Sequence, residues 1–96
     1  MAAAPQGIET QISLHEIRVY EAVRRHTGWL TAREIAVAAD VADRTSRHHA
    51  GRLGEAGVFE VGKVFGGYRY RIASHQTDGG KLHLAALEEA KRIFGV

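Results

Sequence analysis

Apolar residues early in the chain recur at the spacing of an α-helix. They are Leu14, Ile17, Tyr20 and Val23. Ser13 lies directly before this run and Glu16 follows three residues later, which is the pattern of a capping box at a helix N-terminus. Because Gly28 breaks the pattern and basic residues precede it, we predict a helix over residues 13–26.

Two further helices are predicted after a short apolar stretch. Thr31 and Glu34 form a second capping box, which predicts a helix over residues 32–39. A tight connection then leads into a third helix over residues 43–56. Gly57 follows it, at the position where a helix end favours a residue in the left-handed conformation.

Two β-branched and aromatic stretches come next, over residues 58–65 and 68–72. The pair Gly66-Gly67 between them predicts a hairpin with a two-residue turn. Pairing the strands about that turn places three pairs on the side that faces the core: Phe65 with Tyr68, Lys63 with Tyr70, and Val61 with Ile72.

The end of the chain is predicted to be helical from Lys81 to Phe94. Apolar residues cover more than one side of this helix, so it needs a surface that covers it. A length of 96 residues indicates a single domain. We divide the chain into a flexible N-terminus at 1–11, a folded domain at 12–74, a loop at 75–80 and the C-terminal helix at 81–96.

Three runs within residues 13–73 match a known pattern in their order. They are LTAREIA at 30–36, VADRT at 41–45 and RLGEAGVFE at 52–60. In this combination the chain resembles the winged helix-turn-helix regulators of bacteria and archaea, a class that includes MarR-like and ArsR-like repressors. The resemblance implies an α+β, mostly helical fold with a three-helix core, a β-hairpin wing and an extra C-terminal helix.

The chain departs from this pattern in the third helix. Ala42 stands where a Ser or Thr usually caps that helix, which costs about 1 kcal/mol unless a neighbouring aspartate replaces the cap. Gly51 and Gly54 lie inside the helix, where each costs about 1 kcal/mol relative to alanine. Either they permit close packing on a bulky neighbour such as Trp29 or Tyr20, or the end of the helix is loose.

The third helix is the candidate DNA-reading element. Its outward face is expected to carry Arg44, Thr45, Arg47 and His48. Arginine can bond a guanine edge at two positions, and threonine can contact a base or a thymine methyl group. The alternative is a solvated polar face, which any surface helix has. His49 belongs either to this face or to the contact with the body of the domain.

The hairpin and the second helix supply further candidate contacts to DNA. Lys63 and Arg69 are expected to contact the DNA backbone as part of a wing. The alternative use of such cations is to protect an edge strand from pairing. Thr31 and Arg33 lie at a helix N-terminus, which can receive a phosphate, although capping alone also explains Thr31.

The C-terminal helix has two interpretations. It either folds back onto the first helix and completes the core, or pairs with its copy in a twofold dimer. A small DNA-reading domain gains from dimerisation, because the contacts of two half-sites add. We therefore predict a homodimer whose interface includes Leu84, Leu87, Ile93 and Phe94.

The residue types argue against an enzyme and against a metal site. The chain has no cysteine, which excludes thiolate ligands and a cysteine nucleophile. It also lacks the zinc-protease, nucleophile-elbow and phosphate-loop motifs. His75, Asp78 and His83 flank the start of the last helix, but at a spacing that suits a metal poorly. We predict no catalytic residue, no metal and no cofactor.

Positive charge is weak overall and concentrated in one region. The chain carries 13 Lys and Arg against 11 Asp and Glu, a net charge of +2. Residues 41–73 alone carry +3, so the excess lies in the predicted reading helix and wing. With no secretion signal and no membrane-spanning stretch in the sequence, we expect a cytoplasmic, nucleoid-associated protein.

Together these features predict sequence-specific binding of double-stranded DNA by a homodimer, and the resemblance implies transcriptional repression. Helix 43–56 is expected to enter the major groove, with hairpin 58–72 as the wing. Two alternatives stay open. One is a winged-helix module that binds other proteins, and the other is an accessory factor in plasmid or phage replication, partition or excision. The sequence does not indicate an effector.

Overall fold

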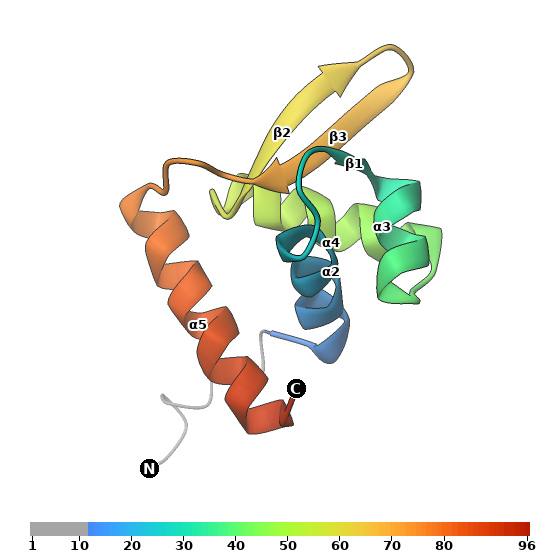
Figure 1. Ribbon diagram of the computed structural model, residues 1–96. Coiled ribbons are helices and arrows are strands. Elements are labelled where there is room, and N and C mark those ends of the chain that lie inside the picture. Colours follow the sequence, from blue (N-terminus) through green and yellow to red (C-terminus); the bar gives the residue numbers. More distant parts are fainter. Residues whose placement is uncertain (1–11) are drawn as a thin grey trace.

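The computed structural model describes residues 12–96 (Figure 1). The helices and strands of this region are α2 (Leu14–Arg24), β1 (Leu30–Thr31), α3 (Ala32–Ala39), α4 (Asp43–Glu55), β2 (Phe59–Val64), β3 (Gly67–Ile72) and α5 (Asp78–Phe94). None of these helices combines the length and the apolar character needed to span a membrane. The flexible N-terminus predicted at 1–11 lies outside the described residues.

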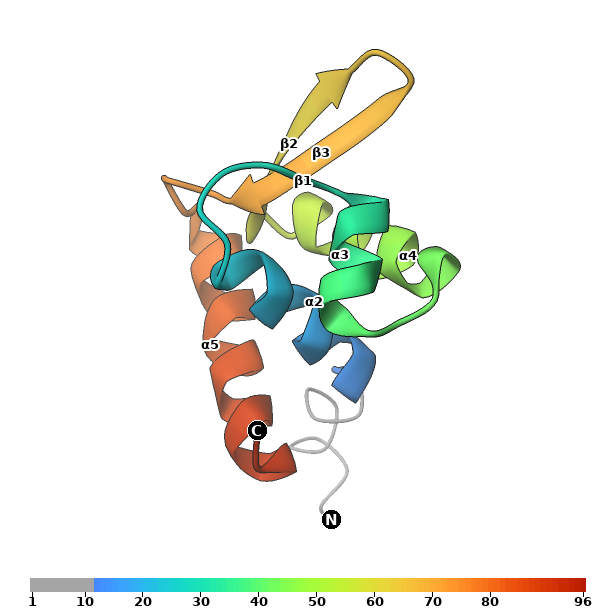
Figure 2. The same cartoon turned by 45° about the vertical axis from the view of Figure 1, so that its right-hand side comes forward.

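Helices α2, α3 and α4 pack together and enclose the core (Figures 1 and 2). The largest fully buried apolar side chains are Ile17, Val19, Val23, Ile35, Leu53, Val58 and Leu87. Of the predicted apolar stripe of the first helix, Ile17, Tyr20 and Val23 are therefore confirmed as buried, whereas Leu14 is half-buried. Helix α3 has the predicted bounds, and α3 and α4 are joined by a tight connection in which Asp40 takes a left-handed φ of 57°.

The three strands form one antiparallel sheet in the order β1-β3-β2. The register of the hairpin pairs Phe59 with Ile72, Val61 with Tyr70, and Lys63 with Tyr68. This register differs by two residues from the predicted one, because the turn consists of Phe65 and Gly66 and Gly67 already belongs to β3. Gly66 takes a left-handed φ of 88°, which glycine adopts without steric cost. A register shift of two residues leaves every side chain on its predicted face of the sheet.

The outer half of the hairpin extends beyond the helices (Figure 1). Phe65 is fully exposed, with a relative exposure of 107%, and Val61 and Tyr68 are about half exposed. Of the residues predicted to face the core, Tyr70 is buried and Ile72 packs at the edge of the core. The prediction was wrong for Lys63, Phe65 and Tyr68, which lie toward the tip where the hairpin extends beyond the helices, and Val61 is only half covered although α4 lies against it.

Helix α4 approaches β2 closely at Gly54. A Cβ atom at Gly54 would lie 2.6 Å from Cγ2 of Val61. The predicted close packing therefore occurs at this glycine, but the neighbour is Val61 and not Trp29 or Tyr20. A Cβ atom at Gly51 would meet nothing within 4 Å among residues 12–96, so the structure gives that glycine no packing role.

Helix α5 begins at Asp78, three residues earlier than predicted, so the predicted loop at 75–80 is shorter. Thr77 caps the helix, since its Oγ1 accepts a hydrogen bond from the amide of Gly80 at 3.0 Å. Gly80 also packs on the turn after α4, where a Cβ atom would lie 2.9 Å from the carbonyl oxygen of Gly57. Gly80 therefore permits close packing at the helix start, and Gly79 and Gly80 both lie inside the helix and not in a loop.

Helix α5 folds back along α2 (Figures 1 and 2). Leu87 is fully buried in the core that the two helices share. The hydroxyl of Tyr20 donates to Glu88 Oε2 at 2.9 Å, and Lys91 Nζ lies 2.7 Å from Glu21 Oε2. One face of α5 thus completes the core of the monomer, as the first interpretation of this helix expected.

Candidate nucleic-acid interface

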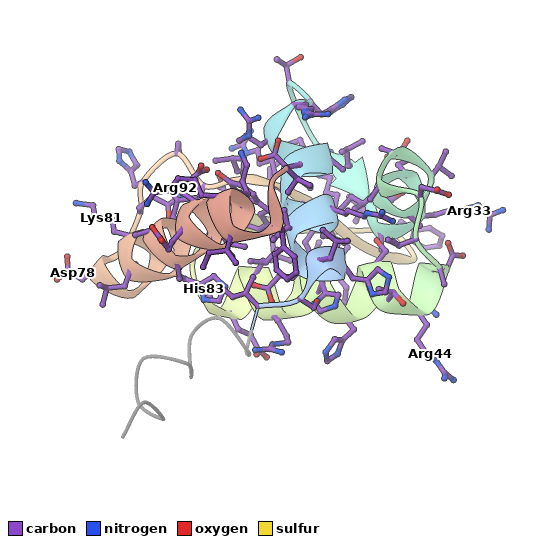
Figure 3. The ribbon with its side chains drawn as sticks, turned by 90° about the horizontal axis from the view of Figure 1, so that it is seen from below. Arg33, Arg44, Asp78, Lys81, His83 and Arg92 are labelled. Carbon is purple, nitrogen blue, oxygen red and sulfur yellow. The ribbon has the colours of Figure 1, made fainter. Side chains whose placement is uncertain are left out.

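Helix α4 turns one face into the core and the other to solvent. Arg44, Arg47 and His48 are exposed on the outer face, and Thr45 is half-buried. Figure 3 shows Arg44 extending away from the body near the start of the helix. Within residues 12–96 neither of the two arginines takes part in an ion pair. The predicted reading residues therefore lie together on one cationic surface.

Ser46 fixes the inner face of α4 against α3. This residue is fully buried, and its Oγ donates a hydrogen bond to the carbonyl oxygen of Ala32 at 2.6 Å. Since Ala32 is the first residue of α3, the bond sets the start of that helix relative to the outer face of α4. Two of the predicted DNA-contacting elements are thereby held in a fixed relation.

The first turn of α4 has no side-chain cap. Ala42 is the N-cap residue and makes no capping hydrogen bond, so neither neighbouring aspartate replaces the missing hydroxyl. Asp43 interacts favourably with the helix dipole instead. Its Oδ2 lies 3.8 Å from Nη1 of Arg33, whose side chain is 83% exposed. An exposed pair at this distance contributes little, which leaves the guanidinium group of Arg33 accessible.

Thr31 and Glu34 form the predicted capping box at the start of α3. Thr31 Oγ1 accepts from the amide of Glu34 at 3.2 Å, and Glu34 Oε1 accepts from the amide of Thr31 at 2.8 Å. Thr31 also pairs with Arg69 of β3 in the sheet register. The hydroxyl of Thr31 is therefore engaged in capping, and its position connects α3 to the wing.

Trp29 supports the root of the wing. The guanidinium groups of Arg69 and Arg71 lie over its indole ring, 4.6 and 4.2 Å from the ring centroid. Arg71 also donates from Nε to Glu60 Oε1 at 3.0 Å. Arg71 is therefore engaged within the protein, whereas Arg69 and Lys63 are the exposed cations of the wing.

A groove with a volume of about 290 Å³ runs between the wing and the start of α3. Arg47 of α4 lines it from one side and residues 65–68 at the wing tip line it from another. Thr31 and Ala32 complete this part of the lining. The reading helix, the start of α3 and the wing thus share one groove on the surface.

His49 turns toward the body of the domain. Its side chain is 12% exposed, and its Nδ1 lies 4.0 Å from Oε1 of the buried Glu16. Burial lowers the pKa of His49 below its usual value, and the Glu16 carboxylate opposes part of that effect. Of the two placements that the sequence left open, the structure therefore shows the one against the body.

The buried carboxylate of Glu16 was missed by the sequence analysis. Oε2 of Glu16 lies 2.7 Å from Nε2 of His83, which reaches it from α5. The predicted capping box is for that reason only half formed: Ser13 Oγ accepts from the Glu16 amide, but the carboxylate turns inward. The spacing of Glu16 to Tyr20 and Val23 places it on the apolar face, and that signal could have revealed its burial.

No metal site is found in the described part of the chain. Among residues 12–96, no three His, Cys, Asp or Glu side chains are grouped so that they could hold a metal ion. Figure 3 shows His83 on the side of α5 that faces the body, with Asp78 at the far end of the helix. The structure therefore does not bring these two residues together.

Helix α5 leaves apolar side chains exposed beyond its contact with α2. They are Leu82, Ile93 and Phe94 in the helix and Val96 after it, with relative exposures of 74%, 54%, 46% and 64%. Two other predicted interface residues lie elsewhere: Leu87 is fully buried and Leu84 is partly buried against the core. Both point to the α2 side because they share a helical face with His83 and Lys91.

Comparison with known proteins identifies the architecture. No protein-family model and no characterised protein sequence matches the chain. Its structure is similar to that of Bordetella bronchiseptica BpsR, whose DNA binding is regulated by 6-hydroxynicotinic acid, with a TM-score of 0.64 and 17% identity over 94% of this chain and 65% of BpsR. It is also similar to ligand-free NadR, with a TM-score of 0.56 and 20% identity over 94% of this chain and 64% of NadR.

The chain spans a little under two thirds of the length of either of these proteins. The shared part contains the three packed helices, the antiparallel hairpin and the helix that follows it. The α+β, mostly helical architecture predicted from the sequence is thereby confirmed. This chain has the winged helix-turn-helix fold.

Proposed function

We propose that this chain binds double-stranded DNA sequence-specifically as a homodimer and acts as a transcriptional repressor. One observation carries the proposal: the outer face of α4 presents exposed arginines that no protein carboxylate pairs with among residues 12–96. Such a face in the second helix of a helix-turn-helix is suited to the major groove. BpsR, a structural neighbour, also binds DNA.

Base contacts are assigned to the first turns of α4. Arg44 and Arg47 each offer a planar fork of donors that fits the O6 and N7 atoms of guanine. Thr45 and His48 lie beside them and can contact a base edge or a thymine methyl group. Since Ser46 anchors the helix to α3, these side chains are presented from a rigid support.

Backbone contacts are assigned to the elements around α4. Lys63 is exposed on the wing, and Arg69 is exposed at its root with its guanidinium group over Trp29. Arg33 extends from the first turn of α3 (Figure 3). The hydroxyl of Thr31 is engaged in the capping box. We therefore propose that Thr31 acts indirectly, by fixing the N-terminus of α3 where it can receive a phosphate. Phosphate contacts of this kind set position and affinity without reading sequence.

The dimer is proposed to form through the exposed apolar residues at the end of α5. Ile93, Phe94 and Val96 are adjacent there, and Leu82 lies on the helical stripe of Ile93. Pairing two copies in this way doubles the cationic surface and presents two reading helices to two half-sites. A regulator of this kind acts on the nucleoid in the cytoplasm.

Selection of bound duplexes from a randomised library tests the DNA-binding part. Binding to the selected duplex should weaken steeply as salt rises, because phosphate contacts release counterions. Arg47→Ala should cost about 1–3 kcal/mol on that duplex and relax the preference at one base pair. Arg92→Ala removes another exposed arginine, on α5, and as the control it should bind as the wild type. Absence of duplex binding at low salt would refute the proposal.

Light scattering tests the homodimer. The wild-type chain should have twice the mass of one chain at micromolar concentration. Phe94→Glu should give the mass of one chain, because a charge cannot be buried in an apolar interface without a partner. Val37→Glu replaces an apolar residue of α3 that is 78% exposed and should leave the dimer intact. A monomeric wild type would rule out this interface.

A further inference from the structure

We propose that Phe65 at the tip of the wing is a wedge that inserts between two base pairs in the minor groove and kinks the duplex. The inference rests on the proposed DNA binding and adds to it a specific mode of reading. In this mode the wing favours sequences that kink easily, in addition to contacting the DNA backbone.

Phe65 has no role in the packing of the protein. Its side chain is fully exposed, with a relative exposure of 107%. It occupies the first position of the two-residue turn, and only Gly66 at the second position needs a left-handed φ. The turn therefore forms with any ordinary residue in place of Phe65, and an aromatic ring there contributes nothing to the fold.

The wing tip is placed where it can reach a minor groove. Phe65 lines the groove on the protein surface that Arg47 lines from α4. When α4 lies in a major groove, a sugar–phosphate strand can run along this surface groove, between the helix and the wing. The hairpin extends past the helices (Figure 1), so its tip then lies across that strand, at the adjacent minor groove.

The charges beside Phe65 favour a nucleic acid over an apolar protein surface. Residues 61–72 contain three cations, Lys63, Arg69 and Arg71, and no Asp or Glu. Lys63 and Arg69 are exposed along the hairpin that carries the aromatic tip. An apolar side chain flanked by cations is the combination with which proteins enter and wedge open a minor groove.

A wedge also needs a rigid support, and the root of the wing supplies one. Trp29 packs closely on the hairpin, since a Cβ atom at Gly62 would lie 3.1 Å from the indole ring. Arg69 and Arg71 lie over the same ring. β3 is hydrogen-bonded on both sides, to β1 and β2. The force that unstacks two base pairs can therefore be transmitted from the body to the tip.

The bend of a selected duplex tests the wedge. Donor and acceptor dyes are placed at the two ends of a duplex recovered by selection, and energy transfer reports the end-to-end distance. The wild type should bend the duplex by about 20° or more, and Phe65→Ala should abolish most of the bend and weaken binding roughly tenfold. Phe65→Leu keeps an apolar wedge and should keep the bend. Val37→Ala, an exposed apolar residue of α3, should behave as the wild type.

The outcomes distinguish a failure of the wedge from a failure of the proposed DNA binding. If the wild type binds the duplex without bending it, or if Phe65→Ala bends it as the wild type does, the wedge is refuted and DNA binding stands. If the wild type binds no duplex, the proposed function fails first. Because Phe65 is not packed, circular dichroism should show the same fold and thermal midpoint for all four proteins.

Discussion

His83 Nε2 lies 2.7 Å from Oε2 of Glu16, a carboxylate that is 1% exposed. The second oxygen of the same carboxylate lies 4.0 Å from Nδ1 of His49. One buried group of α2 thus adjoins α5 on one side and the candidate reading helix α4 on the other. Glu16 therefore links the packing of α5 to the position of α4 on the body of the domain.

Removing His83 should destabilise the protein strongly. Oε1 of Glu16 already has no hydrogen-bond partner, so His83→Ala leaves the whole carboxylate unpartnered in the core. We expect the free energy of unfolding to fall by about 3 kcal/mol, as for other buried pairs that lose one member. Urea unfolding followed by circular dichroism measures this. Arg92→Ala removes the exposed pair with Glu89 and should cost less than about 1 kcal/mol. If His83→Ala and Arg92→Ala lowered the free energy of unfolding equally, the contact of His83 with Glu16 would not be an important source of stability.

The stability should fall as the solution becomes mildly acidic. Burial lowers the pKa of His49, so the unfolded chain binds a proton at this residue more readily than the folded protein does. The contribution of His49 to the free energy of unfolding is complete above the pKa of the unfolded chain, about 6.5. It is lost as the pH falls through the lower pKa that His49 has in the folded protein. Urea unfolding between about pH 7 and pH 5 should show the decline, and His49→Gln should flatten it.

His48→Gln is the matched control for this pH dependence. His48 is the exposed neighbour in the same helix, so its removal should leave most of the decline in place. The groups that face His49 are the Glu16 carboxylate and the charges of His15, His48 and Arg52. An unchanged slope in His49→Gln would show that His49 does not cause the decline.

Local chemistry made the helices predictable. The capping box of Thr31 and Glu34 fixed the start of α3, and the structure has that helix with the predicted bounds. The helical period likewise placed Arg44, Arg47 and His48 on the outer face of α4. These features depend on residues within one or two turns of one another, and the sequence contains all of that information.

Contacts between distant residues could not be predicted in the same way. Glu16 matches a capping box, but its carboxylate turns toward His83, 67 residues along the chain. The run Val64-Phe65-Gly66-Gly67 offers two glycines for one turn, so the register depended on which two residues formed it. The bond from Ser46 to Ala32 joins two helices, and a small buried residue alone does not reveal it.

A cap added to α4 should stabilise the protein. Ala42 has the extended conformation of an N-cap residue, with φ of −68° and ψ of 152°, but no side chain that can accept a hydrogen bond. Ala42→Ser should raise the free energy of unfolding by about 1 kcal/mol. The same substitution at Ala38, inside α3 and exposed, should be neutral or lower it by a few tenths of a kcal/mol. No gain at position 42 would show that solvent already satisfies the first turn.

The two glycines of α4 should respond differently to the same substitution. Gly51→Ala should raise the free energy of unfolding by about 1 kcal/mol, because the site is open and alanine favours the helix. Gly54→Ala should show little or no gain, since its Cβ atom would lie 2.6 Å from Val61 and force that side chain or the wing to move. In a Val61→Ala background, Gly54→Ala should recover the gain seen at Gly51. Equal effects of the two single substitutions would mean that Val61 moves at no cost.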